Sequence, residues 1–317
     1  MQPLKIAILL STFNGERWLP ELLRSLRTQS LPFELIWRDD GSTDATKDIV
    51  RGAEWLQLTE AQHSEAGANM GACASFGVLM ESALNSEADI FFLADQDDVW
   101  APEKLGTIFS RFSFSSIDKP LLLHHDLRVI NEDGEEIASS LWRFMRLDAQ
   151  QTEVARFLTR NSVTGCATAF NRALLEVATP VPATALMHDW WLGLIASAFG
   201  QIRTEEMCLV DYRQHAGNTL GAKGFFHGLN PFTNWVAGWK RGNEEYRALF
   251  PQARALLELL QRRTDTAPSD LADVTAFVSI PDLPFLERCR EANRLGLRDR
   301  STLLWLVAML RVAFTRV

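Results

Sequence analysis

Residues 90–100 have the sequence IFFLADQDDVW, and this stretch decides the fold class. The apolar run Ile90–Ala94 predicts a strand that is buried on both faces, as in a parallel sheet. Three carboxylates follow within four residues, at Asp95, Asp97 and Asp98. Carboxylates at the end of a buried strand are costly unless a cation or hydrogen-bond donors face them. We therefore expect a cation or a ligand at this strand end.

The chemistry of the acid cluster narrows the kind of ligand. Carboxylate oxygens suit Mg²⁺ or Mn²⁺, and Mg²⁺ is usually held by one or two carboxylates together with substrate phosphates. Ligands of open α/β sheets bind beyond the carboxyl ends of the strands. A simpler interpretation is an acidic turn, with Asp98 as the N-cap of the next helix and Pro102 in its first turn. The two are compatible if Asp98 caps while Asp95 and Asp97 face a metal with a phosphorylated ligand.

Strands and helices alternate over the first hundred residues. We expect strands at 5–11, 33–38, 55–58 and 90–94, and helices at 17–29, from 45 onward and at 69–84. This alternation predicts a parallel sheet with helices on both faces, as in half of a nucleotide-binding doubly wound fold. No GxGxxG follows the first strand and no GxxxxGK[ST] occurs, so a dinucleotide-binding Rossmann enzyme and a P-loop NTPase are both disfavoured.

The rest of the chain continues the α/β pattern and then becomes helical. Further strands are expected at 120–130, 161–170 and 201–212, with a turn at 131–134 and a helix at 187–199. After a stretch rich in glycine and aromatic residues at 220–240, helices are expected at 244–263 and over most of 272–317. The predicted fold class is α/β, with a mixed, mainly parallel sheet flanked by helices and a C-terminal helical extension.

Composition excludes several classes of protein. The chain has 317 residues with 47% hydrophobic and 23% charged residues, typical of a globular protein with a sizeable core. Its net charge of −8 argues against general nucleic-acid binding. Its four cysteines form no CxxC pair, which indicates reduced thiols in the cytoplasm. Because Met1 leads almost directly into a strand, we expect no signal peptide, and no apolar run approaches the about 20 residues that span a bilayer.

Five short motifs lie at the ends of expected strands or at the start of an expected helix: Asp39–Asp44 (DDGSTD), Asp95–Asp98 (DQDD), Asn161–Cys166 (NSVTGC), His188–Trp191 (HDWW) and Tyr212–His215 (YRQH). The first, second and fourth together resemble the inverting GT-A glycosyltransferases of family 2. The other two narrow the resemblance to the rhamnosyltransferase-like branch. The resemblance implies a GT-A catalytic domain at 1–220, with the donor site mainly in 1–100 and the acceptor side in 120–220, followed by an aromatic-rich segment and helical C-terminal region at 221–317.

The resemblance implies a nucleotide-sugar site in the first hundred residues. Thr12 and Asn14 would bind the base and the ribose at the end of the first strand. Asp40 would accept a hydrogen bond from N3–H of uracil or thymine, a proton that cytosine lacks. Asn69 would meet ribose or phosphate at a helix start, or act as a plain N-cap. Asp95 is expected on a ribose hydroxyl.

The same resemblance implies a metal site for the diphosphate. Asp97 would hold Mg²⁺ or Mn²⁺ as in the DxD motif of the family. His215 would be a further metal ligand, a diphosphate contact or a structural residue. Arg213 would clamp the diphosphate, since guanidinium pairs well with phosphate oxygens. The metal would stabilise the charge that builds on the leaving diphosphate.

Asp189 is the expected catalytic base. Inversion needs a carboxylate that deprotonates the acceptor hydroxyl on the face opposite the leaving group. The place of Asp189 at a helix N-terminus would stabilise its anion and keep it unprotonated at neutral pH. The alternative is a simple N-cap for the helix that follows.

Other residues are expected to shape the acceptor and sugar pocket. Trp190 and Trp191 would form its wall, because aromatic faces suit the C–H surfaces of sugars, although a core position suits Trp191 nearly as well. Asp126 and the backbone at Thr164 and Gly165 would complete the pocket.

The C-terminal stretch 287–317 contains seven arginines against three acids, a balance of +4 in a chain of net charge −8. Its apolar segment Thr302–Leu310 is too short to span a membrane. With aromatic residues between 225 and 239, this pattern favours a membrane-surface anchor. A terminal helix packed on the catalytic domain or on a second subunit explains it equally well. The protein would be free in the cytoplasm or peripheral on the cytoplasmic face of the inner membrane. The sequence is compatible with a monomer or with a homo-oligomer.

The resulting hypothesis is an inverting, metal-assisted glycosyltransferase. It would move L-rhamnose from dTDP-L-rhamnose to a hydroxyl of a bacterial surface glycan, such as O-antigen, or of a lipid-linked oligosaccharide. A UDP-hexose donor is the first alternative, since thymine and uracil differ by one methyl worth about 1 kcal/mol of discrimination. A non-catalytic nucleotide- or sugar-binding module is the second. A nucleotidyltransferase is disfavoured because no basic glycine-rich triphosphate loop occurs near the N-terminus.

Overall fold

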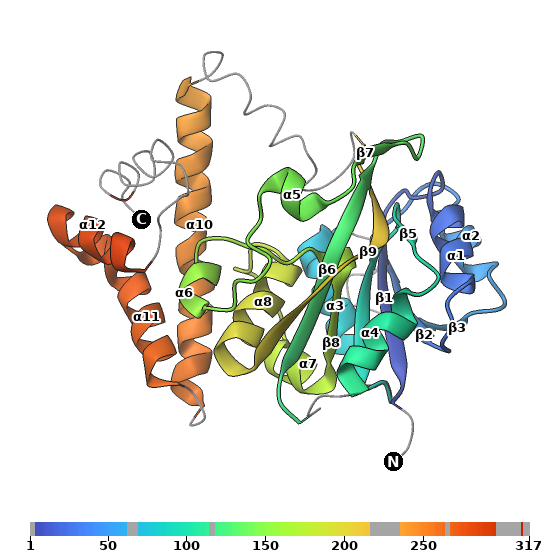
Figure 1. The fold of residues 1–317 in the computed structure, drawn as a ribbon, viewed down its shortest axis with the longest axis horizontal. Coiled ribbons are helices and arrows are strands. Elements are labelled where there is room, and N and C mark those ends of the chain that lie inside the picture. The colour runs from blue at the N-terminus through green and yellow to red at the C-terminus, as the bar shows by residue number, and fades with distance from the viewer. Residues whose placement is uncertain are drawn as a thin grey trace.

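The computed structural model describes residues 4–61, 69–113, 118–215, 235–263, 267–295 and 312. These residues form a nine-stranded sheet with helices on both faces (Figure 1). The strand order is β3-β2-β1-β4-β8-β6-β9-β5, with β7 paired to β6. The α/β fold class predicted from the sequence is confirmed.

The N-terminal half of the sheet is parallel. Its strands are β1 (Ile6–Thr12), β2 (Glu34–Asp39), β3 (Gln57–Glu60) and β4 (Ile90–Asp95), and the intervening helices are α1 (Leu19–Arg27), α2 (Thr46–Arg51) and α3 (Ala72–Ala83). Neighbouring residues of β1 enter different apolar clusters: Ala7 and Leu9 pack on the α3 side, and Ile8 and Leu10 on the α1 side. Burial on both faces explains why these strands are continuous apolar runs. The carboxyl ends of β1, β2 and β4 therefore meet at one edge.

The second half of the sheet is mixed. Its elements are β5 (Val99–Trp100), α4 (Lys104–Ser113), β6 (Leu121–Ile130), β7 (Glu136–Ala138), α5 (Leu141–Met145), α6 (Val154–Phe157), β8 (Thr168–Asn171), α7 (Arg172–Ala178), α8 (His188–Phe199) and β9 (Gln201–Arg213). Strand β8 runs antiparallel to β4 and β6, whereas β9 runs parallel to β6 and antiparallel to β5. The β6–β7 connection turns at Gly134, whose φ of 87° suits the glycine predicted there.

The C-terminal helices pack against the α/β part, at the left of Figure 1. They are α10 (Trp235–Arg262), α11 (Pro268–Ser279) and α12 (Phe285–Arg294). Phe250 and Phe277 stack with ring centroids 5.0 Å apart and belong to the same apolar cluster as Phe157 and Leu192. One core therefore continues from α6 and α8 into the extension.

The prediction that Asp98 is the N-cap of the next helix is wrong. Strand β5 follows Asp98 directly, and α4 begins only at Lys104.

Most of the basic and apolar stretch 287–317, and the aromatic residues Phe225, Phe226 and Phe232, lie outside the described residues. Among the described helices, none is both long and apolar enough to cross a membrane.

Candidate active site

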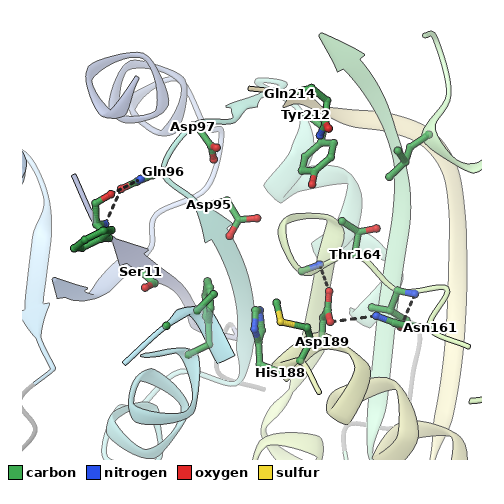
Figure 2. Close-up of a pocket in the computed structure, with 18 of the residues that line it drawn as sticks. Ser11, Asp95, Gln96, Asp97, Asn161, Thr164, His188, Asp189, Tyr212 and Gln214 are labelled. Carbon is green, nitrogen blue, oxygen red and sulfur yellow. Dashed lines mark hydrogen bonds between the residues drawn. The ribbon is translucent and has the colours of Figure 1, made fainter. Parts of the chain in front are cut away.

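A pocket of about 380 Å³ opens where β1, β2 and β4 end. One wall consists of residues between 11 and 97, here called the strand-end wall. The other consists of residues between 129 and 215, here called the far wall. Figure 2 shows Asp95 near the centre, with Asp97 above it and with His188 and Asp189 below and beside it. Residues from the motifs at 95–98, 161–166, 188–191 and 212–215 thus line one cavity.

Asp40 shows how the strand-end wall is built. Its buried carboxylate accepts hydrogen bonds from the backbone N–H groups of Met70 (3.0 Å) and Gly71 (2.9 Å) and pairs with Arg38 at 3.0 Å. Gly71 has a φ of 80°, a backbone conformation that favours glycine. Asp40 thus joins the end of β2 to the start of α3 and also lines the pocket together with Asn69.

The loop after β2 is held by side chains that cap the backbone. Asp39 accepts hydrogen bonds from the N–H groups of Gly41 (3.2 Å) and Ser42 (2.8 Å), and from the hydroxyl of Thr12, which lines the pocket. Asn14, with a φ of 47°, accepts a hydrogen bond from the N–H of Thr43 at 2.9 Å and is not part of the pocket lining. Asn14 was predicted to contact the donor, but in the structure it joins the loop after β1 to the loop after β2.

Asp97 and His215 form a pair inside the pocket. Nε2 of His215 lies 2.6 Å from Oδ2 of Asp97, and both side chains are mostly buried. The imidazole also stacks on Trp18, with ring centroids 4.1 Å apart. A carboxylate and an imidazole placed this way are a usable pair of ligands for a divalent cation. The two residues predicted as metal ligands are thus brought together.

Asp95 lies next to this pair at the end of β4. Burial raises the pKa of its carboxyl to about 7, and the charges of Asp97 and Asp189 add to the shift. At neutral pH the ionised form of Asp95 is therefore destabilised by its burial and by the negative charges of Asp97 and Asp189. A bound cation would offset these charges and favour the ionised form. The neighbouring pair Asp97 and His215 suits Mg²⁺ or Mn²⁺ by the chemistry of its ligand atoms.

A second cluster of ligand atoms lies deeper. Asp95, Asp98 and Cys166 offer atoms within 4.8 Å of one another. Asp98 and Cys166 are fully buried, and burial with nearby acid charges raises the pKa of the Cys166 thiol well above its ordinary value. A protonated thiol is a poor ligand for hard cations. By its chemistry, a hard cation therefore suits the pair Asp97 and His215 better than this cluster.

Lys104 is the cation beneath the acids, and the sequence analysis missed it. It is completely buried, its Nζ donates to the carbonyl of Cys166 at 2.7 Å, and it lies 3.4 Å from the ring centroid of Trp100. Burial lowers its pKa to about 7. Lys104 is the first residue of α4, nine residues after the end of β4, and nothing in the local sequence distinguishes it from a surface lysine.

Arg213 supports the site from outside the pocket. Its guanidinium is buried and donates to the carboxylate of Glu21 (2.7 Å) and to the carbonyls of Asp97 (2.9 Å) and Glu132 (3.1 Å). Its own N–H donates to Asp98 at 3.1 Å. The prediction of a diphosphate clamp is wrong in this structure, because the guanidinium points into the protein and fixes the loop that carries Asp97.

Asp189 faces the pocket from the far wall. Its carboxylate accepts hydrogen bonds from the N–H of Gly165 at 2.9 Å and from the amide of Asn161 at 3.1 Å, as Figure 2 shows. The N-cap of α8 is Met187, so Asp189 lies inside the first turn and is no N-cap. Burial raises the pKa of Asp189 to about 6 despite these donors. The expected lowering by the helix N-terminus is therefore outweighed, yet most of the carboxyl is still ionised at pH 7.

Three residues predicted for the acceptor pocket belong to the core instead. Trp191 is 1% exposed and donates from Nε1 to the carbonyl of Ala178 at 2.8 Å. Trp190 donates from Nε1 to the carbonyl of Phe157 at 2.6 Å. Asp126 is buried at a bulge of β6, where it accepts from the N–H groups of Leu127 and Trp142 and from the hydroxyl of Ser140. None of the three lines the pocket, whereas Thr164 and Gly165 do.

The structure also adds pocket residues that the sequence analysis did not select. Gln96 holds the backbone of Phe13 by two hydrogen bonds of 2.9 Å, and both residues line the pocket. Tyr212 and His188 enter from the far wall. Gln96, His188 and Tyr212 lie within motifs that had already been identified, and Phe13 lies between the selected residues Thr12 and Asn14; that adjacency was the available signal.

Comparisons with known proteins agree with this geometry. Residues 7–118 match the family model "Glycosyl transferase family 2". An uncharacterized glycosyltransferase of Nostoc sp. is 27% identical over 228 residues, which is 68% of this chain and 66% of that relative. An uncharacterized protein of Mycobacterium tuberculosis is 27% identical over 222 residues, which is 67% of this chain and 59% of that relative. The chain thus matches less than two thirds of the length of each relative.

Solved structures show the same fold. TarS 1–349 of S. aureus, in complex with UDP-GlcNAc, has a TM-score of 0.57 and 15% identity, over 98% of this chain and 82% of that chain. The mannosyltransferase PcManGT from Pyrobaculum calidifontis, in complex with GDP-Man and Mn²⁺, has a TM-score of 0.50 and 15% identity, over 98% and 86% of the two chains. The fold is therefore that of the GT-A glycosyltransferases. Within this fold, residues 7–118 are similar to glycosyl transferase family 2.

Proposed function

We propose that this protein is a metal-dependent, inverting glycosyltransferase that uses a pyrimidine nucleotide-sugar. One observation carries the proposal: Asp189 and the pair Asp97–His215 line the same pocket from different chain segments. A carboxylate that can accept a proton therefore shares a cavity with a ligand set suited to a diphosphate-bound cation.

The chain's residues divide the work of the reaction. Asp40, Asn69 and Asp95 bind the nucleoside at the strand-end wall. A divalent cation held by Asp97 and His215 would neutralise the diphosphate as it leaves. Asp189 takes the proton from the acceptor hydroxyl, the hydroxyl oxygen bonds to the anomeric carbon, and the diphosphate departs from the opposite face. The hydrogen bonds from Asn161 and Gly165 fix the carboxylate of Asp189 for this step.

The donor sugar is proposed to be L-rhamnose, carried by dTDP. Support comes from the resemblance of the motifs at 161–166 and 212–215, and from an apolar section of the far wall that suits the methyl group of a 6-deoxy sugar. This section is formed by Leu141, Phe144, Met145, Leu147 and Val163. A UDP-hexose is the second candidate, because the structural neighbour TarS was solved with UDP-GlcNAc.

The acceptor is proposed to be a hydroxyl of a bacterial surface glycan or of a lipid-linked oligosaccharide. Such an acceptor is consistent with a protein that works at the cytoplasmic face of a membrane. Liposome flotation of the full chain and of a form without residues 287–317 tests this part. Weaker partitioning of the shortened form is expected, and equal partitioning would contradict a membrane-surface role for that stretch.

A donor panel tests the activity itself. The protein is incubated in Mn²⁺ with dTDP-L-rhamnose, UDP-glucose, UDP-GlcNAc and GDP-mannose, and the released nucleoside diphosphate is measured with and without glycan acceptors. Release from a dTDP- or UDP-sugar, abolished by EDTA, is the expected result. Release from GDP-mannose alone would contradict the proposed recognition of a pyrimidine.

A further inference from the structure

The side chain of Gln96 joins two chain segments of the pocket that follow different strands. Its Oε1 accepts a hydrogen bond from the N–H of Phe13, and its Nε2 donates to the carbonyl of the same residue, both at 2.9 Å. Figure 2 shows the two bonds as dashed lines at Gln96. The last paired residues of β1 and β4 are Ser11 and Asp95. The Gln96 bridge thus links the two strands beyond the point at which their backbone pairing ends.

The segments on both sides of the Gln96 bridge belong to the site. Thr12 and Phe13 line the pocket, and the carbonyl of Thr12 accepts a hydrogen bond from the N–H of Asp40 at 2.8 Å. On the other side, Gln96 directly precedes Asp97. The bridge therefore connects the segment that holds the proposed nucleoside contact, Asp40, to the segment that carries the proposed metal ligand, Asp97.

Gly15 shows how closely the backbone approaches the bridge. A Cβ atom at position 15 would stand 2.2 Å from Oε1 and 2.6 Å from Cδ of Gln96, and the three atoms nearest to it all belong to Gln96. Glycine permits this close approach because it has no Cβ. With alanine at position 15, the Gln96 amide would have to move away from Phe13, which breaks the bridge. The bridge in this geometry therefore requires glycine at position 15.

A nucleoside diphosphate would contact the segments on both sides of the bridge, with its nucleoside toward Asp40 and its diphosphate toward a cation at Asp97. A ligand held at two places binds best when both places already have the right separation, since ordering them on binding costs free energy. We propose that Gln96 is a positioning residue that holds the nucleoside side and the metal side of the donor site at the separation that the nucleotide needs; this inference rests on the proposed function.

The first experiment removes the bridge with Gln96→Ala. Calorimetric titrations of dTDP and UDP in Mn²⁺ measure the affinity of the variant and of wild type. We expect the nucleotide that wild type prefers to bind about 3- to 10-fold more weakly, because the two segments must now be ordered when the ligand binds. Gln96→Met replaces the alanine variant if that protein does not fold by circular dichroism, since it keeps the length of the side chain without the amide.

Gln29→Ala is the matched control. The amide of Gln29 also joins a distant segment by two backbone groups, donating to the carbonyl of Ala101 at 2.9 Å and accepting from the N–H of Leu105 at 3.1 Å. Gln29 does not line the pocket. Denaturant unfolding compares the stability of the two variants, and the nucleotide affinity of Gln29→Ala should stay within twofold of wild type.

Gly15→Ala tests the bridge without changing Gln96 itself. In the wild-type background it should displace the Gln96 amide and weaken nucleotide binding by about the same factor as Gln96→Ala. In the Gln96→Ala background the new methyl group meets no amide, so it should change affinity by less than about twofold. Two changes that act through one contact are expected to be non-additive in this way.

The outcomes separate this inference from the proposed function. Weaker nucleotide binding in Gln96→Ala but not in Gln29→Ala, with a non-additive effect of Gly15→Ala, supports the positioning role. Affinity within twofold of wild type in Gln96→Ala, an equal loss in Gln29→Ala, or additive losses with Gly15→Ala would overturn it and leave the proposed transferase function intact. Failure of the wild-type protein to bind either nucleotide would overturn the proposed function together with this inference.

Discussion

The two walls of the pocket are built on different principles. The strand-end wall uses residues at the ends of adjacent parallel strands, β1, β2 and β4, whose register places Ser11 beside Asp95. The far wall collects residues from several separate segments between 129 and 215. Sheet geometry alone positions the first wall, whereas the second depends on how distant segments pack.

The walls also differ in what their acids do. On the strand-end wall, Asp40 accepts hydrogen bonds from backbone N–H groups and still lines the pocket, and the Asp97 side chain is directed to His215. Between residues 129 and 215 and in the neighbouring strand β6, two predicted site acids differ. Asp126 accepts hydrogen bonds inside the core and does not line the pocket, whereas Asp189 does. An acid in a motif is therefore a functional candidate only if backbone donors leave part of its carboxylate exposed to the cavity.

The largest expected effect concerns Asp189, the proposed base on the far wall. Asp189→Asn should lower kcat about 10²- to 10⁴-fold, the range for a lost general base. Donor affinity should change little, because the proposed contacts to the nucleoside and to the metal do not include Asp189. Steady-state kinetics and calorimetry of the same preparation check this. A kcat within threefold of wild type would eliminate Asp189 as the base.

The proposed metal site at Asp97 and His215 is the next target. Asp97→Asn should weaken Mn²⁺-dependent nucleotide binding about 100-fold, because it removes a charged ligand. Cys166→Ala is the matched control, since it changes the deeper cluster, which suits a hard cation less well. Nucleotide titrations at several Mn²⁺ concentrations measure both variants. A larger loss in Cys166→Ala than in Asp97→Asn would move the metal site to the deeper cluster.

Asp126 tests whether a motif-like acid can be purely structural. Asp126→Ala leaves the buried donors of Leu127, Ser140 and Trp142 unpaired and should destabilise the protein by about 1–3 kcal/mol. Denaturant unfolding measures this loss. Nucleotide affinity at a temperature where the variant is folded should stay within twofold of wild type. A large loss of nucleotide affinity without loss of stability would indicate that Asp126 acts in the binding site after all.

The smallest expected effect is on the pH profile. Since the pKa of Asp189 is about 6, kcat should fall about tenfold between pH 7 and pH 5 as the base is protonated. The raised pKa means that the native state holds this proton more tightly than the unfolded chain does, so this group's contribution to stability grows as pH falls. Loss of activity with retained folding is thus expected, and a flat profile down to pH 5 would contradict the assignment.

The accuracy of the sequence predictions follows the same division. The parallel half was predictable because each apolar run and the polar turn after it specify a strand and its end. Asp97, His215 and Asp189 were placed in one pocket from their motifs. Trp191 and Asp126 were misassigned because their partners, the carbonyl of Ala178 and the hydroxyl of Ser140, are set by tertiary packing.

Buried polar residues were the hardest to predict. Lys104 and His188 look like surface or motif residues in the sequence, and only their burial changes their charge. The sequence around Arg213 suggests phosphate binding, yet its guanidinium donates to the carboxylate of Glu21, which lies 192 residues earlier in the chain. Such long-range pairs leave no local pattern.

The most direct test of the account is calorimetric titration of dTDP, UDP and GDP into the protein, with Mn²⁺ and again with EDTA. We predict that dTDP or UDP binds in Mn²⁺, loses most of its affinity in EDTA, and binds more tightly than GDP. Absence of binding by all three nucleotides would contradict the assignment of this pocket as a donor site.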